Sequence, residues 1–317
     1  MRTITALFVG LGSIGTRHLK NLTNLCADRG WTLQADALRS DLSRPLRDGV
    51  AALLHAQYTD LADAPAHYDM VFITNPTSLH AEALRQVRGR GEALFIEKPI
   101  FSAEQTGLAL ADYLPAGQKA YVAAPMRWCG VMLALKDRLP GLHPYCARVI
   151  CSSYLPDWRP GVDYRTVYSA HKAMGGGVTI DLIHEWDYLV ELFGVPEQLY
   201  NFKGTYSDLK IDSDDLSVYI ARYPTLLAEV HLDYFGRGYR RSIELFCHDG
   251  SYLADFGAGT LTLPDGTVQH YEEDVNRRYE REMEYFVDYA LTGSGESCNP
   301  PALALNVLKL TLGENVQ

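Results

Sequence analysis

The 317-residue chain has no long apolar run and no excess of positive charge. No stretch reaches the roughly 18 consecutive apolar residues typical of a membrane-spanning helix, so the sequence predicts no span. Lys and Arg number 29 against 39 Asp and Glu, which gives a formal net charge of −10. Because phosphate backbones select basic surfaces, nucleic acid is not expected as the main partner. A small anion in a local basic pocket is still compatible with this charge.

Cysteine is scarce and scattered. None of the cysteines forms a CxxC pair or a Cys/His cluster with zinc spacing; they are Cys26, Cys129, Cys146, Cys151, Cys247 and Cys298. We therefore expect buried free thiols in a reducing compartment. The first apolar run passes directly into Gly10 without the cleavage pattern of a signal peptide. Together these observations predict a cytoplasmic protein.

The first part of the chain, residues 1–124, alternates short apolar runs with helical patterns. Such alternation predicts crossover connections and a parallel, doubly wound sheet, that is, an α/β domain. The chain is also too long for one typical core, which favours two domains. Strands are expected over residues 4–9, 33–38, 70–74, 94–96 and 121–124, with a short one at Tyr58. Helices are expected over 15–24 and 78–88, and a polar helical stretch around Leu53 and His55.

The second part, residues 125–317, has a different pattern. Several strands follow one another between residues 199 and 263 with Asp-Gly turns and little helix between them, which indicates an antiparallel sheet. A further β-rich run covers 146–154. Helices are expected over 128–139, 175–193, 277–291 and 303–312. The sequence therefore predicts an α+β domain after the α/β domain.

The strongest motif is a GxGxxG sequence between the first expected strand and the first expected helix. In this context Gly10 permits a tight turn, Gly12 lets backbone N–H groups approach a pyrophosphate, and Gly15 permits close helix–strand packing. The helix N-terminus adds the positive end of its dipole. The motif predicts a bound dinucleotide, with Gly10, Gly12, Ser13 and Ile14 among the cofactor-binding residues.

The residues after the second expected strand bear on the choice of cofactor. An acidic residue there would hold the ribose 2′-hydroxyl of NAD. This chain instead has Arg39 and Ser40, a guanidinium and a hydroxyl that suit the 2′-phosphate of NADP. We therefore favour NADP over NAD. Asp36 or Asp41 is the alternative, NAD-binding ligand, since strand ends read from a sequence shift by a few residues.

Two later strands of the first domain end in polar segments. Thr74, Asn75 and Pro76 follow one strand, and Glu97 and Lys98 follow the next. Because ligands of open α/β sheets bind at the carboxyl ends of the strands, we expect these residues beside the ribose and nicotinamide. Glu97 either orients Lys98 or holds cofactor. Asn-Pro is also an ordinary turn signal, and that alternative stays open.

Lys98, Asp181 and His184 have the chemistry that hydride transfer requires. Oxidation of a carbinol needs a base for the hydroxyl proton and a donor for the developing oxyanion. The Lys98 ammonium can donate to the oxygen. Asp181 and His184 are expected on one face of a helix, where Asp181 binds substrate hydroxyls and His184 acts as base; Lys98 is the alternative base. His184, Glu185 and Asp187 lack a further well-spaced ligand, so no metal is expected.

Aromatic and basic residues gather before the glycine run at 175–177. Aromatic rings stack on sugar faces, and arginines fork onto carboxylate or phosphate. We expect the substrate to be bound by Trp158, Arg159, Tyr164 and Arg165, together with Asp181. An anionic or nucleotide-linked sugar suits this set. An oligomer contact or an ordinary ordered loop is the alternative.

The order of these motifs resembles the glucose–fructose oxidoreductase / inositol dehydrogenase / MocA family. The resemblance covers essentially the whole chain and rests on the GxGxxG fingerprint, Asn75-Pro76…His80, Glu97-Lys98-Pro99, and Gly175–Gly177 followed by Asp181, His184 and Asp187. It implies a Rossmann domain followed by an α+β domain with a large, open, mainly antiparallel sheet. It also implies NAD(P)-dependent oxidation or reduction of a sugar, cyclitol, sugar phosphate or sugar nucleotide.

The same resemblance implies particular roles and partners. Lys98 is the implied catalytic lysine, and His80 joins the cofactor-binding set. Arg127, at the start of the expected linking helix, is implied to line the active site and bind substrate. The open sheet face is the implied surface of a homodimer or homotetramer. Members have Asp-x-x-x-His where this chain has the shorter spacing from Asp181 to His184. Two alternatives keep the fold: a non-catalytic NAD(P)-sensing regulator, and a lyase or hydrolase that uses bound NAD transiently. The retained Lys98, Asp181 and His184 favour the dehydrogenase.

Overall fold

The computed structural model describes residues 2–316 and divides them into two compact units. Unit 1 runs to Pro125 and includes Tyr279–Leu305, and unit 2 comprises Met126–Arg278 and the residues from Asn306 onward. The change at 125/126 falls beside the division expected at residue 124. The sequence analysis places 279–305 in the C-terminal domain, whereas the structure packs them with the N-terminal sheet.

Unit 1 is built on a parallel sheet of six strands in the order β3-β2-β1-β4-β5-β6. The strands are β1 Thr3–Val9, β2 Thr32–Leu38, β3 Ala56–Tyr58, β4 Tyr68–Ile73, β5 Gly91–Ile96 and β6 Lys119–Val122. This is the strand order of a dinucleotide-binding Rossmann fold, which confirms the predicted class. The order reverses between β1 and β4, and the carboxyl ends of these strands mark the ligand crevice.

The helices of unit 1 explain why 279–305 belongs to it. They are α1 Ser13–Asp28, α2 His80–Gln86, the part of α6 (Val275–Thr292) from Tyr279 onward, and the first turn of α7 (Pro301–Thr311). Phe286 of α6 packs edge-on against Phe72 and Phe95 of the sheet, with ring centroids 5.4 and 5.1 Å apart. The predicted helix around Leu53 is wrong: only a 3₁₀ turn at Ala51–Leu53 forms, and it buries no side chain.

Unit 2 is built on a sheet of eight strands in the order β14-β13-β12-β11-β7-β10-β9-β8. The strands are β7 Cys146–Tyr154, β8 Gln198–Gly204, β9 Leu216–Arg222, β10 Leu227–Asp233, β11 Phe235–Cys247, β12 Gly250–Asp255, β13 Thr260–Thr262 and β14 Val268–His270. Every neighbouring pair is antiparallel except β7 and β10, which confirms the predicted mainly antiparallel sheet.

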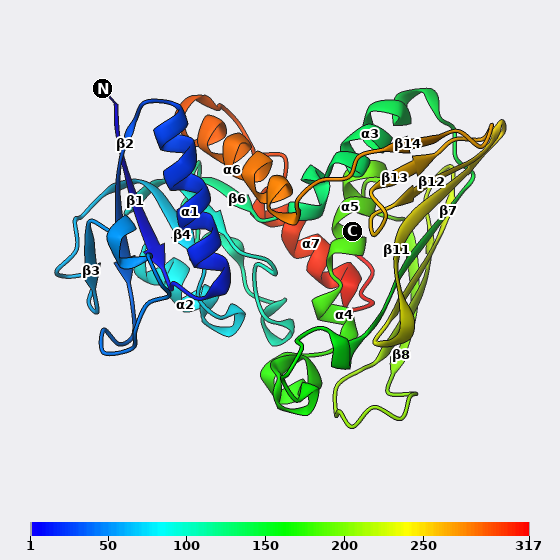
Figure 1. The fold of residues 1–317 in the computed structure, drawn as a ribbon, viewed down its shortest axis with the longest axis horizontal. Coiled ribbons are helices and arrows are strands. Elements are labelled where there is room, and N and C mark those ends of the chain that lie inside the picture. Colours follow the sequence, from blue (N-terminus) through cyan, green and yellow to red (C-terminus); the bar gives the residue numbers. More distant parts are fainter. Residues whose placement is uncertain (1, 317) are drawn as a thin grey trace. The chain divides into compact units, whose positions relative to one another are not determined.

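One face of this sheet carries the helices of unit 2. Figure 1 shows α3 (Gly130–Arg138), α4 (Val178–Asp181) and α5 (His184–Phe193) on that face, and no helix of the described residues on the other. Burial alternates along β9, where Ser217, Tyr219 and Ala221 are buried and the residues between them are not. Such period-two burial is expected of a sheet that packs on one side only.

The single helix predicted over 175–193 is wrong, because the chain forms two helices with a break between them. Leu182 has φ −99° and ψ 32°, outside the helical region, so α4 ends at Asp181 and α5 begins at His184. Gly175 and Gly177 have φ of +78° and +129°, which keeps the preceding residues out of the helix. Asp181 and His184 therefore do not share the face of one helix, as their spacing had suggested.

The described residues contain no helix that is both long and apolar enough to cross a membrane. All six cysteines are free thiols. Within residues 2–316, no group of three His, Cys, Asp or Glu side chains is arranged to hold a metal ion.

Candidate active site

The fingerprint turn joins β1 to α1. Its three positions are occupied by glycine for different physical reasons. A Cβ on Gly10, which has φ +88°, would lie 2.9 Å from the Asn75 Cα, and one on Gly15 would lie 2.6 Å from the Thr74 Oγ1. Both contacts are too close, so these two positions require glycine. A Cβ on Gly12 would meet no atom within 4 Å. No contact among the described residues requires glycine at position 12, and a pyrophosphate lying against its backbone would.

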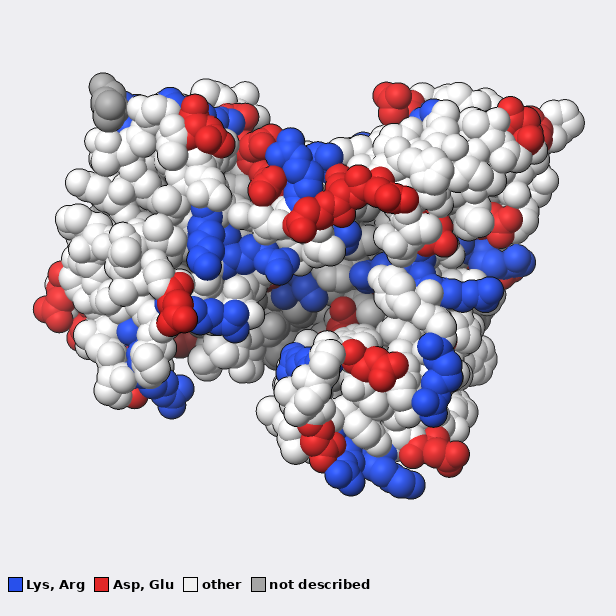
Figure 2. Space-filling model, viewed as in Figure 1, with Lys and Arg blue, Asp and Glu red and all other residues white. Residues whose placement is uncertain are grey.

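The N-terminus of α1 is open to an anion. Gly12 occupies the N-cap position, no side chain caps the helix, and no acidic residue lies in its first turn. Its first backbone N–H groups therefore have no partner within the helix. Figure 2 shows Lys and Arg side chains gathered over the N-terminal half of α1. The predicted residues Ser13, which is exposed, and Ile14, which is half-buried, form the first turn.

An arginine that the sequence analysis did not single out reaches this turn. Arg47 Nη2 donates a hydrogen bond to Ser13 Oγ at 2.9 Å. The signal in the sequence was the recurrence of arginine in the loop after β2, at 39, 44 and 47. Arg39 Nη1 donates to Gln57 Oε1 at 2.8 Å, and Nη2 donates to the backbone oxygen of Arg44. Two guanidinium groups are thus held on the loop, next to the exposed Ser40.

Asp36 and Asp41, the two acidic residues considered as NAD ligands, both form hydrogen bonds within the protein. Asp36 is 2% exposed; it accepts from Tyr68 OH at 2.8 Å and lies 3.1 Å from His55 Nδ1. Asp41 accepts from the backbone N–H and the hydroxyl of Ser43 at 2.8 and 2.7 Å, and these bonds lower the pKa of Asp41. Asp36 is buried in the sheet, so it is not placed to hold a ribose.

The segment after β4 packs directly on the fingerprint turn. Thr74 Oγ1 donates to the Gly10 carbonyl at 2.6 Å. Asn75 is half-buried, and its Oδ1 is buried with no hydrogen-bond partner among the described residues, while Pro76 is exposed. Since buried polar atoms are normally paired, the Asn75 amide has acceptor capacity for a ligand at the crevice.

His80 supports this segment from within the protein. It is 1% exposed, with Nδ1 3.1 Å from the Pro99 carbonyl and Nε2 3.0 Å from the Asn75 carbonyl. Burial lowers the pKa of His80, against the opposing effect of these carbonyls and of Glu97. The contacts join the loops after β4 and β5. The expected cofactor contact of His80 is not among them, because both ring nitrogens face protein carbonyls.

Lys98 lies directly after β5 and is half-buried, and the peptide bond to Pro99 is cis. Glu97 is 7% exposed; its Oε1 lies 2.5 Å from His18 Nε2, and its Oε2 accepts from the Lys98 backbone N–H at 3.1 Å. Burial raises the pKa of Glu97, but the hydrogen bond from His18 and the positive charge of Lys98 outweigh it, so the pKa of Glu97 is lowered overall. These contacts favour a positioning role for Glu97.

In unit 2, two tyrosines converge on the carboxylate of Asp181. Tyr168 OH donates to Oδ1 at 2.7 Å and Tyr234 OH donates to Oδ2 at 2.5 Å, while Asp181 is 8% exposed. Burial and the nearby carboxylate raise the pKa of both tyrosines, so they remain neutral donors. Tyr234 was not predicted from the sequence, since it lies 53 residues away, in the bend between β10 and β11. His184, at the start of α5, is half-buried.

The predicted substrate loop packs against the two tyrosines that bond to Asp181. The Trp158 ring lies edge-on to Tyr234 at 5.2 Å between centroids, and the Arg159 guanidinium lies 5.6 Å from the Tyr168 ring. Trp158, Arg159 and Tyr164 also line one small cavity within the loop. Arg165 instead forms a bidentate pair with Asp163 over 2.7–3.1 Å. Arg159 has no ion pair within residues 2–316.

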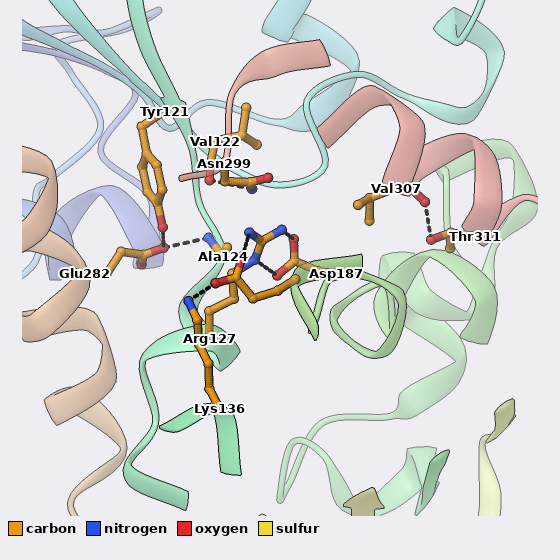
Figure 3. Close-up of polar contacts among 11 residues, drawn as sticks. Tyr121, Val122, Ala124, Arg127, Lys136, Asp187, Glu282, Asn299, Val307 and Thr311 are labelled. Carbon is orange, nitrogen blue, oxygen red and sulfur yellow. Dashed lines mark hydrogen bonds and ion pairs between the residues drawn. The ribbon is translucent and has the colours of Figure 1, made fainter. Parts of the chain in front are cut away.

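Arg127 departs from the expected substrate role. It is 3% exposed, and its guanidinium donates to both oxygens of Asp187, at 2.9 and 2.7 Å, and to Glu191 at 2.6 Å. Figure 3 shows the side chain pointing toward Asp187. Arg241 of β11 is similarly paired with the fully buried Glu185 at 2.6 Å. These arginines satisfy buried carboxylates of α5 and are not placed to bind substrate.

The geometry defines a Rossmann dinucleotide site with a lysine at a strand end, and comparison with known proteins agrees. Residues 4–121 match the model of the GFO_IDH_MocA oxidoreductase family, which has an NAD-binding Rossmann fold. This match covers the N-terminal sheet and less than half of the chain. It is 27% identical over 199 residues to the uncharacterized oxidoreductase YrbE of Bacillus subtilis (strain 168). That match covers 61% of this chain and 54% of YrbE, so the chain spans about half the length of this curated relative.

Solved structures resemble the whole chain. Levoglucosan dehydrogenase in complex with NADH and levoglucosan has a TM-score of 0.82 at 15% identity, over 98% of this chain and 96% of that one. A putative NADPH-dependent oxidoreductase from Desulfitobacterium hafniense has a TM-score of 0.81 at 16% identity, over 99% and 95%. At these identities the likeness establishes the fold.

Proposed function

We propose that the protein is an NAD(P)-dependent dehydrogenase or reductase that transfers a hydride between nicotinamide and a carbinol or ketone of a sugar, cyclitol or sugar derivative. The observation that carries the proposal is the fingerprint turn, where a Cβ added to Gly12 would meet no described atom within 4 Å and no side chain caps the N-terminus of α1. The match of residues 4–121 to the oxidoreductase family model and the acceptor capacity of Asn75 support it. Gly10, Gly12, Ser13, Ile14 and Asn75 would hold the dinucleotide.

The bound nicotinamide would supply the hydride acceptor or donor. In the oxidation direction, the Lys98 ammonium donates a hydrogen bond to the carbinol oxygen and stabilises its developing negative charge. His184 takes the hydroxyl proton as general base, with Lys98 as the alternative base. Asp181 orients substrate hydroxyls. Each carboxylate oxygen accepts more than one hydrogen bond, so Tyr168 and Tyr234 leave capacity for the substrate.

We infer a preference for NADP over NAD. Arg39 is held in place by Gln57, Arg47 reaches the fingerprint turn at Ser13, and Ser40 is exposed between them. Guanidinium groups bind phosphate through charge-assisted hydrogen bonds. Of the two acidic alternatives, Asp36 is buried against Tyr68, and Asp41 is bonded to Ser43. The local chemistry therefore suits a 2′-phosphate better than a free 2′-hydroxyl.

We also propose that the substrate carries a carboxylate or phosphate near Arg159. This guanidinium is exposed, lies over the Tyr168 ring, and has no carboxylate partner among the described residues. Tyr168 is itself bonded to Asp181, the residue proposed to orient the sugar. Trp158, edge-on to Tyr234, would add an aromatic surface for the sugar ring. Levoglucosan dehydrogenase, of similar fold, is a precedent for a sugar substrate.

The uncovered face of the eight-stranded sheet is the proposed surface for a second copy of the chain. It exposes large apolar side chains, including Phe202 at 76% and Ile220 at 40%. Apolar sheet faces of this kind mark association sites. Light scattering should give the mass of a dimer or tetramer, and Phe202→Glu should shift it toward the monomer. A monomeric wild-type protein at micromolar concentration would contradict this assignment.

The proposed activity is tested by fluorescence titration with NADPH and NADH, followed by assays against sugars, sugar phosphates and sugar nucleotides. The dehydrogenase predicts binding and a change in nicotinamide absorbance with at least one panel member. Binding without hydride transfer across the panel would favour the regulatory alternative. Tight NAD that copurifies and is regenerated during turnover would favour the lyase or hydrolase.

A further inference from the structure

We propose that His18 and Glu97 form a buried positioning pair that fixes Lys98 relative to the fingerprint helix. The inference rests on the proposed function, in which Lys98 stabilises the oxyanion. His18 lies on α1 and is fully buried, and its Nε2 is 2.5 Å from Glu97 Oε1. The second oxygen of Glu97 accepts from the Lys98 backbone N–H at 3.1 Å. One carboxylate thus connects the helix to the residue proposed for catalysis.

Aromatic packing holds the His18 ring in one orientation. Its centroid lies 4.7 Å from the Phe95 ring and 6.1 Å from the Tyr279 ring, edge-on to the latter. His18 Nδ1 is buried and has no hydrogen-bond partner among the described residues. A buried N–H without an acceptor is costly, so the ring proton is placed on Nε2, where it is donated to Glu97. His18 therefore acts as a fixed donor.

Glu97 is in turn held from two sides. Its own backbone N–H donates to the Ile73 carbonyl at 2.9 Å, which continues the pairing of β5 with β4. Its carboxylate is buried and ionised, and such a charge persists only where donors surround it. The donors are His18 Nε2 and the Lys98 backbone N–H. Loss of either contact would leave the strand end that carries Lys98 without its anchor.

The His18–Glu97 pair connects the proposed phosphate site to Lys98, because α1 begins at the fingerprint turn. The N-terminus of α1 would face the phosphates of a bound cofactor, and His18 lies further along the same helix. The pair therefore fixes the distance between the proposed phosphate site and Lys98 within unit 1. Catalysis depends on such positioning, since a displacement of about 1 Å reduces rates by about 100-fold.

A matched control lies on the same strand. Glu92, near the other end of β5, pairs with His67 at 2.9 Å, but both side chains are more than half exposed. It has the same residue types and strand but no contact with Lys98. Glu92→Gln should therefore change none of the properties that Glu97→Gln changes.

The variants to compare are Glu97→Gln, His18→Leu, His18→Gln and Glu92→Gln. Against the substrate that the panel identifies, Glu97→Gln and His18→Leu should lower kcat by about 10- to 100-fold. Their NADPH Kd should stay within about twofold of wild type. His18→Gln, which keeps a side-chain N–H donor, should recover most of the activity. A downfield imidazole N–H proton resonance should be present in the wild type and in Glu92→Gln, and absent from the other three.

Two outcomes would overturn the positioning role. One is wild-type kcat in folded Glu97→Gln and His18→Leu. The other is a loss of kcat matched by an equal loss of NADPH affinity, which would indicate a general structural role. Acetic anhydride labelling of Lys98 tests the pair without turnover: its rate should change in Glu97→Gln and His18→Leu but not in Glu92→Gln. If no substrate is turned over yet labelling changes as expected, the proposed function fails and the pair stands.

Discussion

Arg47 Nη2 donates a hydrogen bond to Ser13 Oγ at 2.9 Å, which joins the loop after β2 to the fingerprint turn. This contact brings a guanidinium to the N-terminus of α1, the proposed phosphate site. It is the second arginine of the loop held in a defined position, since Arg39 is bonded to Gln57.

The first prediction concerns cofactor choice. Arg39→Gln and Arg47→Gln should each weaken NADPH binding by roughly 10- to 100-fold, because each removes a charge-assisted hydrogen bond to phosphate. NADH affinity should change much less for Arg39→Gln, since NADH lacks the 2′-phosphate. Fluorescence titration with both nucleotides measures this. A wild-type preference for NADH would show that the interpretation of Arg39 and Ser40 is wrong.

The second prediction separates two fingerprint glycines. Gly15→Ala should lower the thermal midpoint by at least about 3 °C, because its Cβ would lie 2.6 Å from both the Gly10 carbonyl and the Thr74 Oγ1. Gly12→Ala should leave the midpoint within about 1 °C yet weaken NADPH binding at least about 10-fold. Calorimetry and titration of the two variants decide the matter. Unchanged NADPH affinity in Gly12→Ala would remove the main support for the dinucleotide site.

The third prediction compares two arginines of the substrate loop. Arg159→Gln should raise KM for sugar acids or sugar phosphates by roughly 10-fold or more while leaving neutral analogues unaffected. Arg165→Gln is the control, because Arg165 is already paired with Asp163. Kinetics on matched neutral and anionic sugars measure the difference. Equal effects of the two variants would argue against an anion subsite at Arg159.

The fourth prediction concerns pH and His80. Burial lowers the pKa of His80 in the folded state below its ordinary value of 6.5, so the unfolded chain binds the proton more readily. The corresponding stability is present above about pH 6.5 and is lost as pH falls toward the folded value. One proton changes the free energy of unfolding by at most about 1.4 kcal/mol per pH unit.

Urea unfolding at several pH values measures this dependence. Below about pH 6.5, wild-type stability should fall more steeply than that of His80→Gln, which has no titrating ring. Parallel pH profiles for the two proteins would show that His80 titrates alike in the folded and unfolded states.

The sequence predicted the fold well because its signals are local. Alternating apolar runs and the fingerprint identify the parallel sheet of unit 1, and the Asp-Gly turns identify the antiparallel sheet of unit 2. The break at Leu182 has no such signal, because its apolar neighbours continue the helical pattern and only the backbone leaves it. The return of α6 to unit 1 depends on Phe286 meeting Phe72 and Phe95, a contact between residues far apart in the chain.

The site could be predicted where a local motif indicates the role of a residue. It could not be predicted where a side chain's partner lies far away in the sequence. Lys98 and the glycines stand in recognisable local motifs. Arg127 looked available for substrate, but Asp187 lies 60 positions further on, and their ion pair is visible only in the fold. His18 fitted the apolar face of α1, and its contact with Glu97 spans 79 positions. Figure 3 gives a similar case, in which the buried Glu282 accepts from Tyr121 and from the Ala124 backbone.

The central claim is that Lys98 acts in hydride transfer at a dinucleotide bound by unit 1. The most direct test is to measure NADPH binding and turnover side by side in the wild-type protein and Lys98→Met. We predict the same NADPH Kd within about twofold, and a fall in kcat of at least about 100-fold, the size expected for loss of an oxyanion donor. Wild-type turnover in Lys98→Met would contradict the account.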